Sequence, residues 1–101
     1  MGAPRAELLQ EAIDLTTGDR LESYGEPVEK MQLAANIANA ILRRDLTAWE
    51  VSIVQLSFKL ARTATNKTHR DSTVDAMAYA GIAFECALDE IAPANRGTPL
   101  T

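Results

Sequence analysis

Apolar residues recur at intervals of three and four along most of the chain, which is the spacing of amphipathic α-helices. The first such segment runs from Pro4 to Leu15, and Gly18 follows it as a C-terminal cap. The second segment begins at Pro27 and reaches Arg44. Its apolar face is predicted to point into the protein and comprises Met31, Leu33, Ala34, Ile37, Ala38, Ile41 and Leu42.

Two more helices are predicted in the second half of the chain. Thr47 and Glu50 form a capping box, in which each side chain bonds the backbone N–H of the other residue, so a third helix starts here and covers residues 49–64. Apolar residues surround most of its axis, which indicates a helix buried on nearly all sides. The fourth helix runs from Asp71 to Ile91, and its acidic first turn suits the helix dipole.

The chain is therefore predicted to be an all-α protein, a four-helix bundle in a single domain. The domain covers residues 1–92, and residues 93–101 form a flexible C-terminal tail that starts with Pro93. No alternating strand pattern and no internal repeat appears. Because 101 residues can bury only a modest core, self-association is expected.

Charge and composition exclude several classes of partner. A net charge of −4 disfavours duplex nucleic acid, whose phosphates require a basic surface. No apolar run is long enough to cross a membrane and the N-terminus lacks the apolar core of a signal peptide, so no membrane partner and a cytoplasmic location are expected. The single Cys86 cannot form an intramolecular disulfide and is interpreted as a small core residue.

One face of the third helix is polar although the rest of the helix is apolar. The fourth helix carries a matching line of polar residues at intervals of four. Opposite charges on neighbouring helices of an apolar bundle predict a site for a charged ligand. The polar residues of the third helix are Ser52, Gln55, Lys59 and Arg62, and those of the fourth are Asp71, Asp75 and Tyr79.

Lys59 and Arg62 carry the chemistry of a phosphate site, because an ammonium group and a guanidinium group bind phosphate oxygens directly. The alternative is that both side chains extend into water from a partly exposed edge. Tyr79 is suited to stacking on a nucleotide base, and equally to a place in the core.

Asp71 and Asp75 are candidates for binding a divalent metal ion, because carboxylates four residues apart on a helix reach one ion. Mg²⁺ is the metal considered, although no cofactor is required by the interpretation. The alternative is that Asp71 caps the fourth helix while Asp75 forms a salt bridge with Lys59 or Arg62.

The loops supply further candidates. His69 precedes the fourth helix beside the other candidate residues, with an ordinary surface position as the alternative. The loop between the first two helices holds Asp19, Arg20 and Tyr24, and functional residues concentrate on such loops. The alternative there is turn chemistry, with the loop glycines at positive φ.

Several short motifs, in a fixed order, resemble a family of small uncharacterised phage and prophage proteins over roughly residues 7–90. That family lies near the MazG-like all-α nucleotide pyrophosphohydrolases. The resemblance implies a MazG-like bundle, a nucleotide ligand and a homo-oligomer built from dimers. The motifs are residues 15–20 (LTTGDR), 24–27 (YGEP), 59–62 (KLAR) and 69–72 (HRDS), with Val74, Asp75 and Tyr79.

The chain departs from the MazG-like enzymes in its acidic residues. Those enzymes hold Mg²⁺ with an E-x-x-E pair on one helix and an E-x-x-D pair on a later one. This chain keeps Asp71 and Asp75 on the later helix but has Lys59 and Arg62 where the earlier acidic pair is expected. The departure favours direct phosphate binding over hydrolysis.

We therefore expect a phage-type protein of the infected bacterial cytoplasm that sequesters a phosphorylated nucleotide, linear or cyclic, acting as a host signal. The cations would hold the phosphates, a tyrosine would stack on the base, and the carboxylates would orient the cations or a ribose hydroxyl. The ligand pocket is expected at or close to a subunit boundary. The alternatives are a Mg²⁺-dependent nucleoside triphosphate pyrophosphohydrolase and a structural helical oligomer without a small ligand. The candidate ligand residues are Asp19, Arg20, Tyr24, Lys59, Arg62, His69, Asp71, Asp75 and Tyr79.

Overall fold

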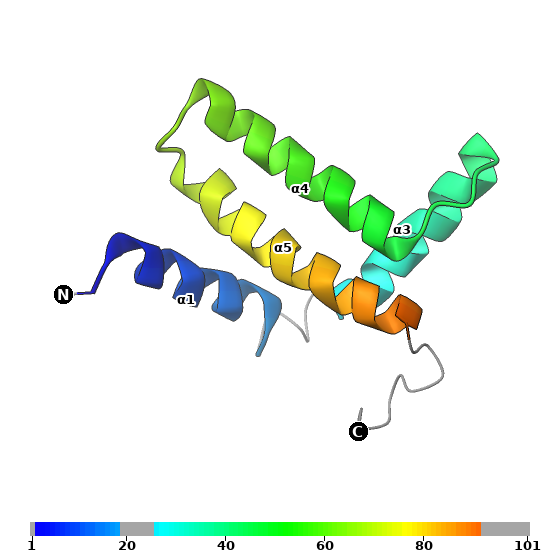
Figure 1. Cartoon of the computed structure of the whole chain (residues 1–101), viewed down its shortest axis with the longest axis horizontal. Coiled ribbons are helices and arrows are strands. Elements are labelled where there is room, and N and C mark those ends of the chain that lie inside the picture. Colours follow the sequence, from blue (N-terminus) through cyan, green and yellow to red (C-terminus); the bar gives the residue numbers. More distant parts are fainter. Residues whose placement is uncertain (1, 19–25, 92–101) are drawn as a thin grey trace.

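A computed structural model describes residues 2–18 and 26–91, and these residues form four α-helices and no strand (Figure 1). The predicted all-α, four-helix fold is thus confirmed. The tail predicted for residues 93–101 lies outside the described residues. In chain order the helices are α1 (Pro4–Thr16), α3 (Pro27–Leu42), α4 (Ala48–Thr65) and α5 (Arg70–Ile91).

The centre of the fold is an antiparallel hairpin of α4 and α5, the two helices that lie side by side along most of their length in Figure 1. Helix α1 runs along the other side of α5, and an ion pair between Arg70 and Glu11 ties these two helices together. Helix α3 packs near the C-terminal end of α5 and then projects away from the hairpin. A small apolar core forms where α3, α4 and α5 meet; its buried members are Val28, Ala48, Ile82 and Cys86, with Met31 and Tyr79 packed against them.

The helix starts follow the local sequence. The capping box predicted at the start of α4 is confirmed, with Thr47 N donating to Glu50 Oε1 at 2.9 Å and Glu50 N donating to Thr47 Oγ1 at 3.1 Å. At the start of α3, the Glu26 carboxylate accepts a hydrogen bond from the backbone N–H of Glu29 at 3.1 Å. Gly18, just after α1, has the positive φ expected of a glycine there, +65°.

Helix α3 ends earlier than predicted. The sequence pattern extends the helix to Arg44, but the last helical residue is Leu42, and Arg43 adopts the left-handed conformation with φ of 56°. The Asn39 side chain accepts from Leu46 N at 2.7 Å and donates to Leu46 O at 3.0 Å. These two bonds hold the chain in a turn back toward α4. The chain could not make this turn if α3 continued beyond Leu42.

The prediction that α3 buries its whole apolar face is wrong. Val28 and Ala35 are buried, but four of the residues predicted to point inward are more than half exposed. Only the first part of α3 lies against the hairpin, so the projecting part has no neighbouring helix to cover it (Figure 1). The four exposed residues are Leu33, Ile37, Ile41 and Leu42.

The prediction that α4 is buried on nearly all sides is also wrong. Its only buried residues are Ala48 and Ser52, whereas Val54, Phe58 and Leu60 are each more than half exposed. The reason is that α4 packs against α5 along one side and against α3 at one end, which leaves the rest of its circumference open. Even so, no helix in the described part of the chain has the length and hydrophobicity needed to cross a membrane.

Candidate functional site

The polar faces of α4 and α5 meet along one side of the hairpin. Ser52 Oγ lies 3.5 Å from Cys86 Sγ, and Lys59 Nζ lies 3.1 Å from Asp75 Oδ2, so two contacts define the antiparallel register. One helical turn further along α4, this register places Arg62 level with Asp71. We call this side the α4–α5 seam; it is formed by Gln55, Lys59, Arg62, Asp71, Asp75 and Tyr79. The structure therefore brings together the candidate residues of the two helices.

Ser52, at the end of the polar face nearest the core, has a structural role. Ser52 is fully buried and donates a hydrogen bond to Ala48 O at 2.9 Å. Burial raises the pKa of the Cys86 thiol above its ordinary value of 9.0, an effect that the Ser52 hydroxyl partly opposes. Cys86 therefore stays protonated at neutral pH and is the small core residue that the sequence predicts.

The centre of the seam is the Lys59–Asp75 ion pair. This confirms that Asp75 forms a salt bridge with one of the two seam cations, the alternative to a metal-binding role. The side chains keep 28% and 35% of their surface exposed. An ion pair with this much exposure contributes about 0–1 kcal/mol to stability. The Lys59 ammonium group can therefore bind an anion at little cost to the stability of the hairpin.

Arg62 and Asp71 flank this ion pair at the open end of the seam, and both residues are exposed. Neither makes an ion pair or a side-chain hydrogen bond with another residue of the described ranges. Tyr79 lies at the other end, half-buried, and packs against the apolar core. Its ring therefore has the core position that the sequence left open as the alternative to base stacking.

His69, not Asp71, caps α5. The imidazole Nδ1 of His69 accepts a hydrogen bond from Ser72 N at 3.2 Å and lies 2.7 Å from Ser72 Oγ. Because a backbone N–H can only donate, Nδ1 is the unprotonated ring nitrogen. The alternative in which Asp71 caps the helix is wrong, since Asp71 is already the second helical residue. His69 thus has a structural role next to the seam.

Replacing His69 by alanine is expected to lower the free energy of unfolding by about 1 kcal/mol, the usual cost of losing an N-terminal cap. His69→Asn is the matched control, because asparagine is a favoured residue at this position. Urea unfolding followed by circular dichroism measures both variants. Equal stability of His69→Ala and the wild type would show that the Ser72 hydrogen bonds do not stabilise α5.

The remaining candidates are the three residues of the loop after α1 and the proposed metal site. Asp19, Arg20 and Tyr24 lie outside the described residues, so the structure does not place them relative to the seam. Among residues 2–18 and 26–91, no three His, Cys, Asp or Glu side chains are arranged to hold a metal ion. Asp71 and Asp75 alone would supply only two carboxylates, one of which already pairs with Lys59.

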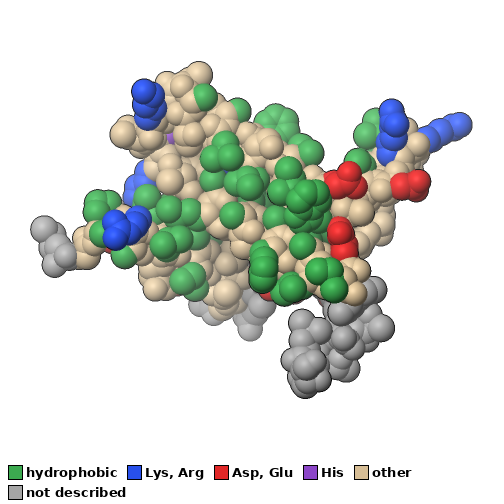
Figure 2. Space-filling view, viewed as in Figure 1, with side chains coloured by type: hydrophobic (Ala, Val, Ile, Leu, Met, Phe, Trp, Pro, Cys, Tyr) green, Lys and Arg blue, Asp and Glu red, His purple; other side chains and the backbone are tan. Residues whose placement is uncertain are grey.

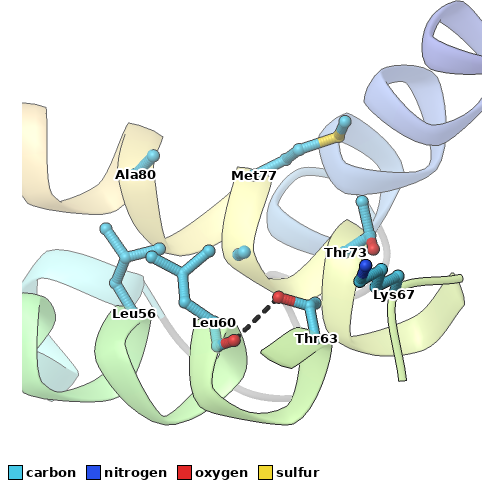
Figure 3. Close-up of a pocket in the computed structure, with 8 residues that line it drawn as sticks. Leu56, Leu60, Thr63, Lys67, Thr73, Met77 and Ala80 are labelled. Atoms are coloured by element: carbon cyan, nitrogen blue, oxygen red, sulfur yellow. Dashed lines mark hydrogen bonds between the residues drawn. The ribbon is translucent and has the colours of Figure 1, made fainter. Parts of the chain in front are cut away.

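Sequence reasoning missed a hollow on the opposite side of the hairpin from the seam. It has a volume of about 470 Å³ and lies between α4 and α5, where Leu56 and Leu60 approach Met77 and Ala80 (Figure 3). Thr63 lines the same hollow and donates to Leu60 O at 2.7 Å. The signal was present in the sequence: a pair of leucines and a pair of alanines (Ala76 and Ala80), each at a spacing of four.

A second, smaller cavity of about 260 Å³ lies in the angle between α3 and α4. It is lined by alanines of α3, Ala34 and Ala38, and by Val51, Val54 and Gln55 of α4, among others. Gln55 is the one residue that this cavity shares with the seam as defined above. The two cavities described here are therefore mainly apolar, with one charged residue each, Lys67 in the first and Glu50 in the second. Neither is lined by a charged residue of the seam.

Comparison with known proteins places these features in a family context. Residues 7–87 match a domain of unknown function, DUF6378. The Gene 55 protein of Mycobacterium phage D29 is 32% identical over 74 residues, which is 73% of this chain and 49% of that protein. The Gene 55 protein of Mycobacterium phage L5 is 30% identical over 84 residues, 82% of this chain and 54% of that protein. The chain thus spans about half the length of both relatives. No solved structure matches the chain.

Proposed function

This chain belongs to the uncharacterised phage family of DUF6378 domains, and we propose that it is a MazG-like protein that binds a phosphorylated nucleotide at the α4–α5 seam. The observation that carries the proposal is the position of Lys59. Its ammonium group is held at the seam by Asp75, 3.1 Å away, and one turn further along α4 the exposed Arg62 adds a second positive charge. Two cations one helical turn apart match neighbouring phosphate oxygens.

The charges of the seam favour an anionic ligand that also carries hydrogen-bond donors. The two seam cations attract phosphate, while Asp71 and Asp75 are suited to hydrogen bonds with a ribose hydroxyl or a base amino group. A nucleotide combines these groups within one molecule. Inorganic phosphate satisfies only the cations, so we expect it to bind more weakly than a nucleotide.

We further propose that the nucleotide is sequestered and not cleaved, for example a host nucleotide signal in the infected bacterial cell. Mg²⁺-dependent hydrolysis needs several free carboxylates around the phosphates. Here three acids near the helix hairpin have other partners: Asp75 pairs with Lys59, Glu26 caps α3 and Glu50 caps α4. Asp71 is then the one seam carboxylate without a side-chain partner in the described residues, and a single free carboxylate is too few. These bonds disfavour the pyrophosphohydrolase alternative.

A thermal-shift screen of linear and cyclic nucleotides, with and without Mg²⁺, tests the proposal. We expect at least one nucleotide to raise the melting temperature, since a ligand that binds only the folded state stabilises it. Chromatography of the ligand recovered after incubation then separates the mechanisms. Intact nucleotide supports sequestration, and cleaved nucleotide supports the enzyme. No shift with any nucleotide would overturn the proposal in favour of a structural helical oligomer.

Chelation is expected to leave binding unchanged. If the cations contact the phosphates directly, excess EDTA should change the dissociation constant of the selected nucleotide by less than about twofold. A change of this size is no larger than the free-energy effect of an ordinary surface substitution. Isothermal titration calorimetry in EDTA and in Mg²⁺ measures this. A loss of affinity in EDTA that Mg²⁺ restores would contradict direct phosphate binding and favour the metal-dependent enzyme.

A further inference from the structure

The side of the α4–α5 hairpin opposite the seam carries exposed apolar side chains of both helices, among them Leu60 and Phe84. Figure 2 shows hydrophobic side chains over the middle of this face, with Lys, Arg, Asp and Glu side chains toward its two ends. The 470 Å³ hollow described above lies on this face, near the turn that joins the two helices. Ala76 and Ala80 keep it open, because their small side chains leave the space between the helices unfilled. We call this face the apolar trough.

Large side chains protrude at the other end of the apolar trough. Met77, Ala80, Phe84 and Leu88 follow one another on α5 at spacings of three and four, so they share one face of the helix. Phe84 is 65% exposed, and Leu88 and Trp49 are also exposed large apolar residues. The face thus has a protruding end, around Phe84, and a hollow end, around Ala76 and Ala80.

We propose that a second copy of this chain packs its α4–α5 hairpin across the apolar trough about a twofold axis. If this axis lies in the plane of the interface and crosses the helices at right angles, it brings the protruding end of each copy over the hollow end of the other. Phe84 then enters the hollow of the second copy twice per dimer, and the two hairpins form a four-helix bundle. A self-complementary patch of this kind is the requirement for a closed twofold dimer.

The exposed apolar residues of the hairpin fit this occupant. Leu60 is 52% exposed, Phe84 65% and Leu88 36%. Large apolar side chains that share an exposed face normally mark an interaction surface. A dimer through the apolar trough would cover these side chains, which an isolated chain leaves in water.

The charges at the ends of the trough also favour a second copy. Lys67 lines the hollow end, close to the turn between α4 and α5. The twofold axis brings it toward the C-terminal end of α5 of the second copy, where Glu90 is exposed and the helix dipole is negative. A like-charged approach would oppose the dimer, whereas this arrangement pairs opposite charges at both ends.

This inference gives a surface to the self-association expected from the sequence, and it does not depend on nucleotide binding. It also changes one expectation, because the seam and the apolar trough lie on opposite sides of the hairpin. A dimer formed through the trough therefore leaves both seams open, and the nucleotide site is not shared at this boundary. Failure of the dimer and failure of the nucleotide proposal are separate outcomes.

Light scattering at micromolar concentration, with the full chain and no nucleotide, tests the proposal. We expect a mass of twice the 11.0 kDa of one chain, or a multiple of that. Phe84→Asp should weaken self-association at least roughly 30-fold, because a charge would enter an apolar hollow in both copies. Phe58→Asp is the matched control: it makes the same change at a phenylalanine that is 67% exposed, on α4, away from the trough.

A wild-type mass of 11.0 kDa overturns the proposal. A dimer that Phe58→Asp disrupts and Phe84→Asp does not also overturns it, and moves the interface to the face of α4 that carries Phe58. If Phe84→Asp does not fold, the variant Met77→Cys/Phe84→Cys decides. An intermolecular disulfide between position 77 of one copy and position 84 of the other supports the dimer, and its absence under oxidation overturns it.

Discussion

Lys59→Ala and Arg62→Ala are each expected to weaken binding of the nucleotide selected by the thermal-shift screen by roughly 10- to 150-fold. This corresponds to about 1.5–3 kcal/mol, the scale of a hydrogen bond to a charged group. The effect should appear in the dissociation constant measured by calorimetry and not in helicity, because both side chains lie at the exposed edge of the α4–α5 seam. Arg44→Ala is the matched control, since it removes one exposed positive charge from the segment that precedes α4, whereas Lys59 and Arg62 lie toward the C-terminal end of that helix.

The ion pair allows a sharper form of this experiment. Lys59→Asp combined with Asp75→Lys keeps an ion pair at the same place but moves the ammonium group to α5. If the pair only stabilises the hairpin, the double variant should recover both the stability and the affinity lost in Lys59→Asp. If Lys59 binds phosphate, stability should recover while affinity remains low. Full affinity in the double variant, or in both alanine variants, would place the nucleotide outside the seam.

Ile82→Ala is expected to lower the free energy of unfolding by about 2–5 kcal/mol, the range for removing a large aliphatic side chain from a core. Ile82 is the largest buried aliphatic residue of the cluster in which α3, α4 and α5 meet, and only 7% of it is exposed. Its other buried members, Val28, Ala48 and Cys86, are smaller and cannot fill the resulting cavity. Because small domains are stable by only about 5–15 kcal/mol, this loss leaves little margin.

Ile41→Ala is the matched control, since it removes the same atoms from α3 at a position that is 75% exposed. We expect a change of less than about 0.5 kcal/mol there, as for ordinary surface substitutions. Urea unfolding at a fixed protein concentration, followed by circular dichroism, measures both variants. Equal losses in the two would show that Ile41 is covered in solution, and that the interface lies on α3 instead of the apolar trough.

Short-range sequence signals predicted the secondary structure well. The capping box of Thr47 and Glu50 identified the start of α4, and Pro27 identified the start of α3. These signals are reliable because the hydrogen bonds that satisfy a helix end come from residues within one turn of it. The early end of α3 was missed because it depends on Asn39 bonding Leu46, seven residues away and outside the helix.

The polar spacing of α4 and α5 was enough to group the seam residues on each helix, because positions three and four apart share a face whatever surrounds the helix. The pairing between the helices was left open at this stage. The sequence allowed Asp75 to pair with either Lys59 or Arg62, and the register of the hairpin selects Lys59. The same register separates the core contact between Ser52 and Cys86 from the open positions of the seam.

The positions of the helices, apart from the end of α3, and the residues that share each helix face could be predicted from the amino acids alone, since both follow from interactions within a few residues. Which apolar faces are covered depends instead on how the helices pack. Ala35 and Ile37 lie on one apolar helix, yet the first is fully buried and the second is half-exposed, because α3 meets the hairpin on one side of its N-terminal part only. Hydrophobicity favours burial without direction, so the choice among several apolar faces belongs to the packing of whole helices.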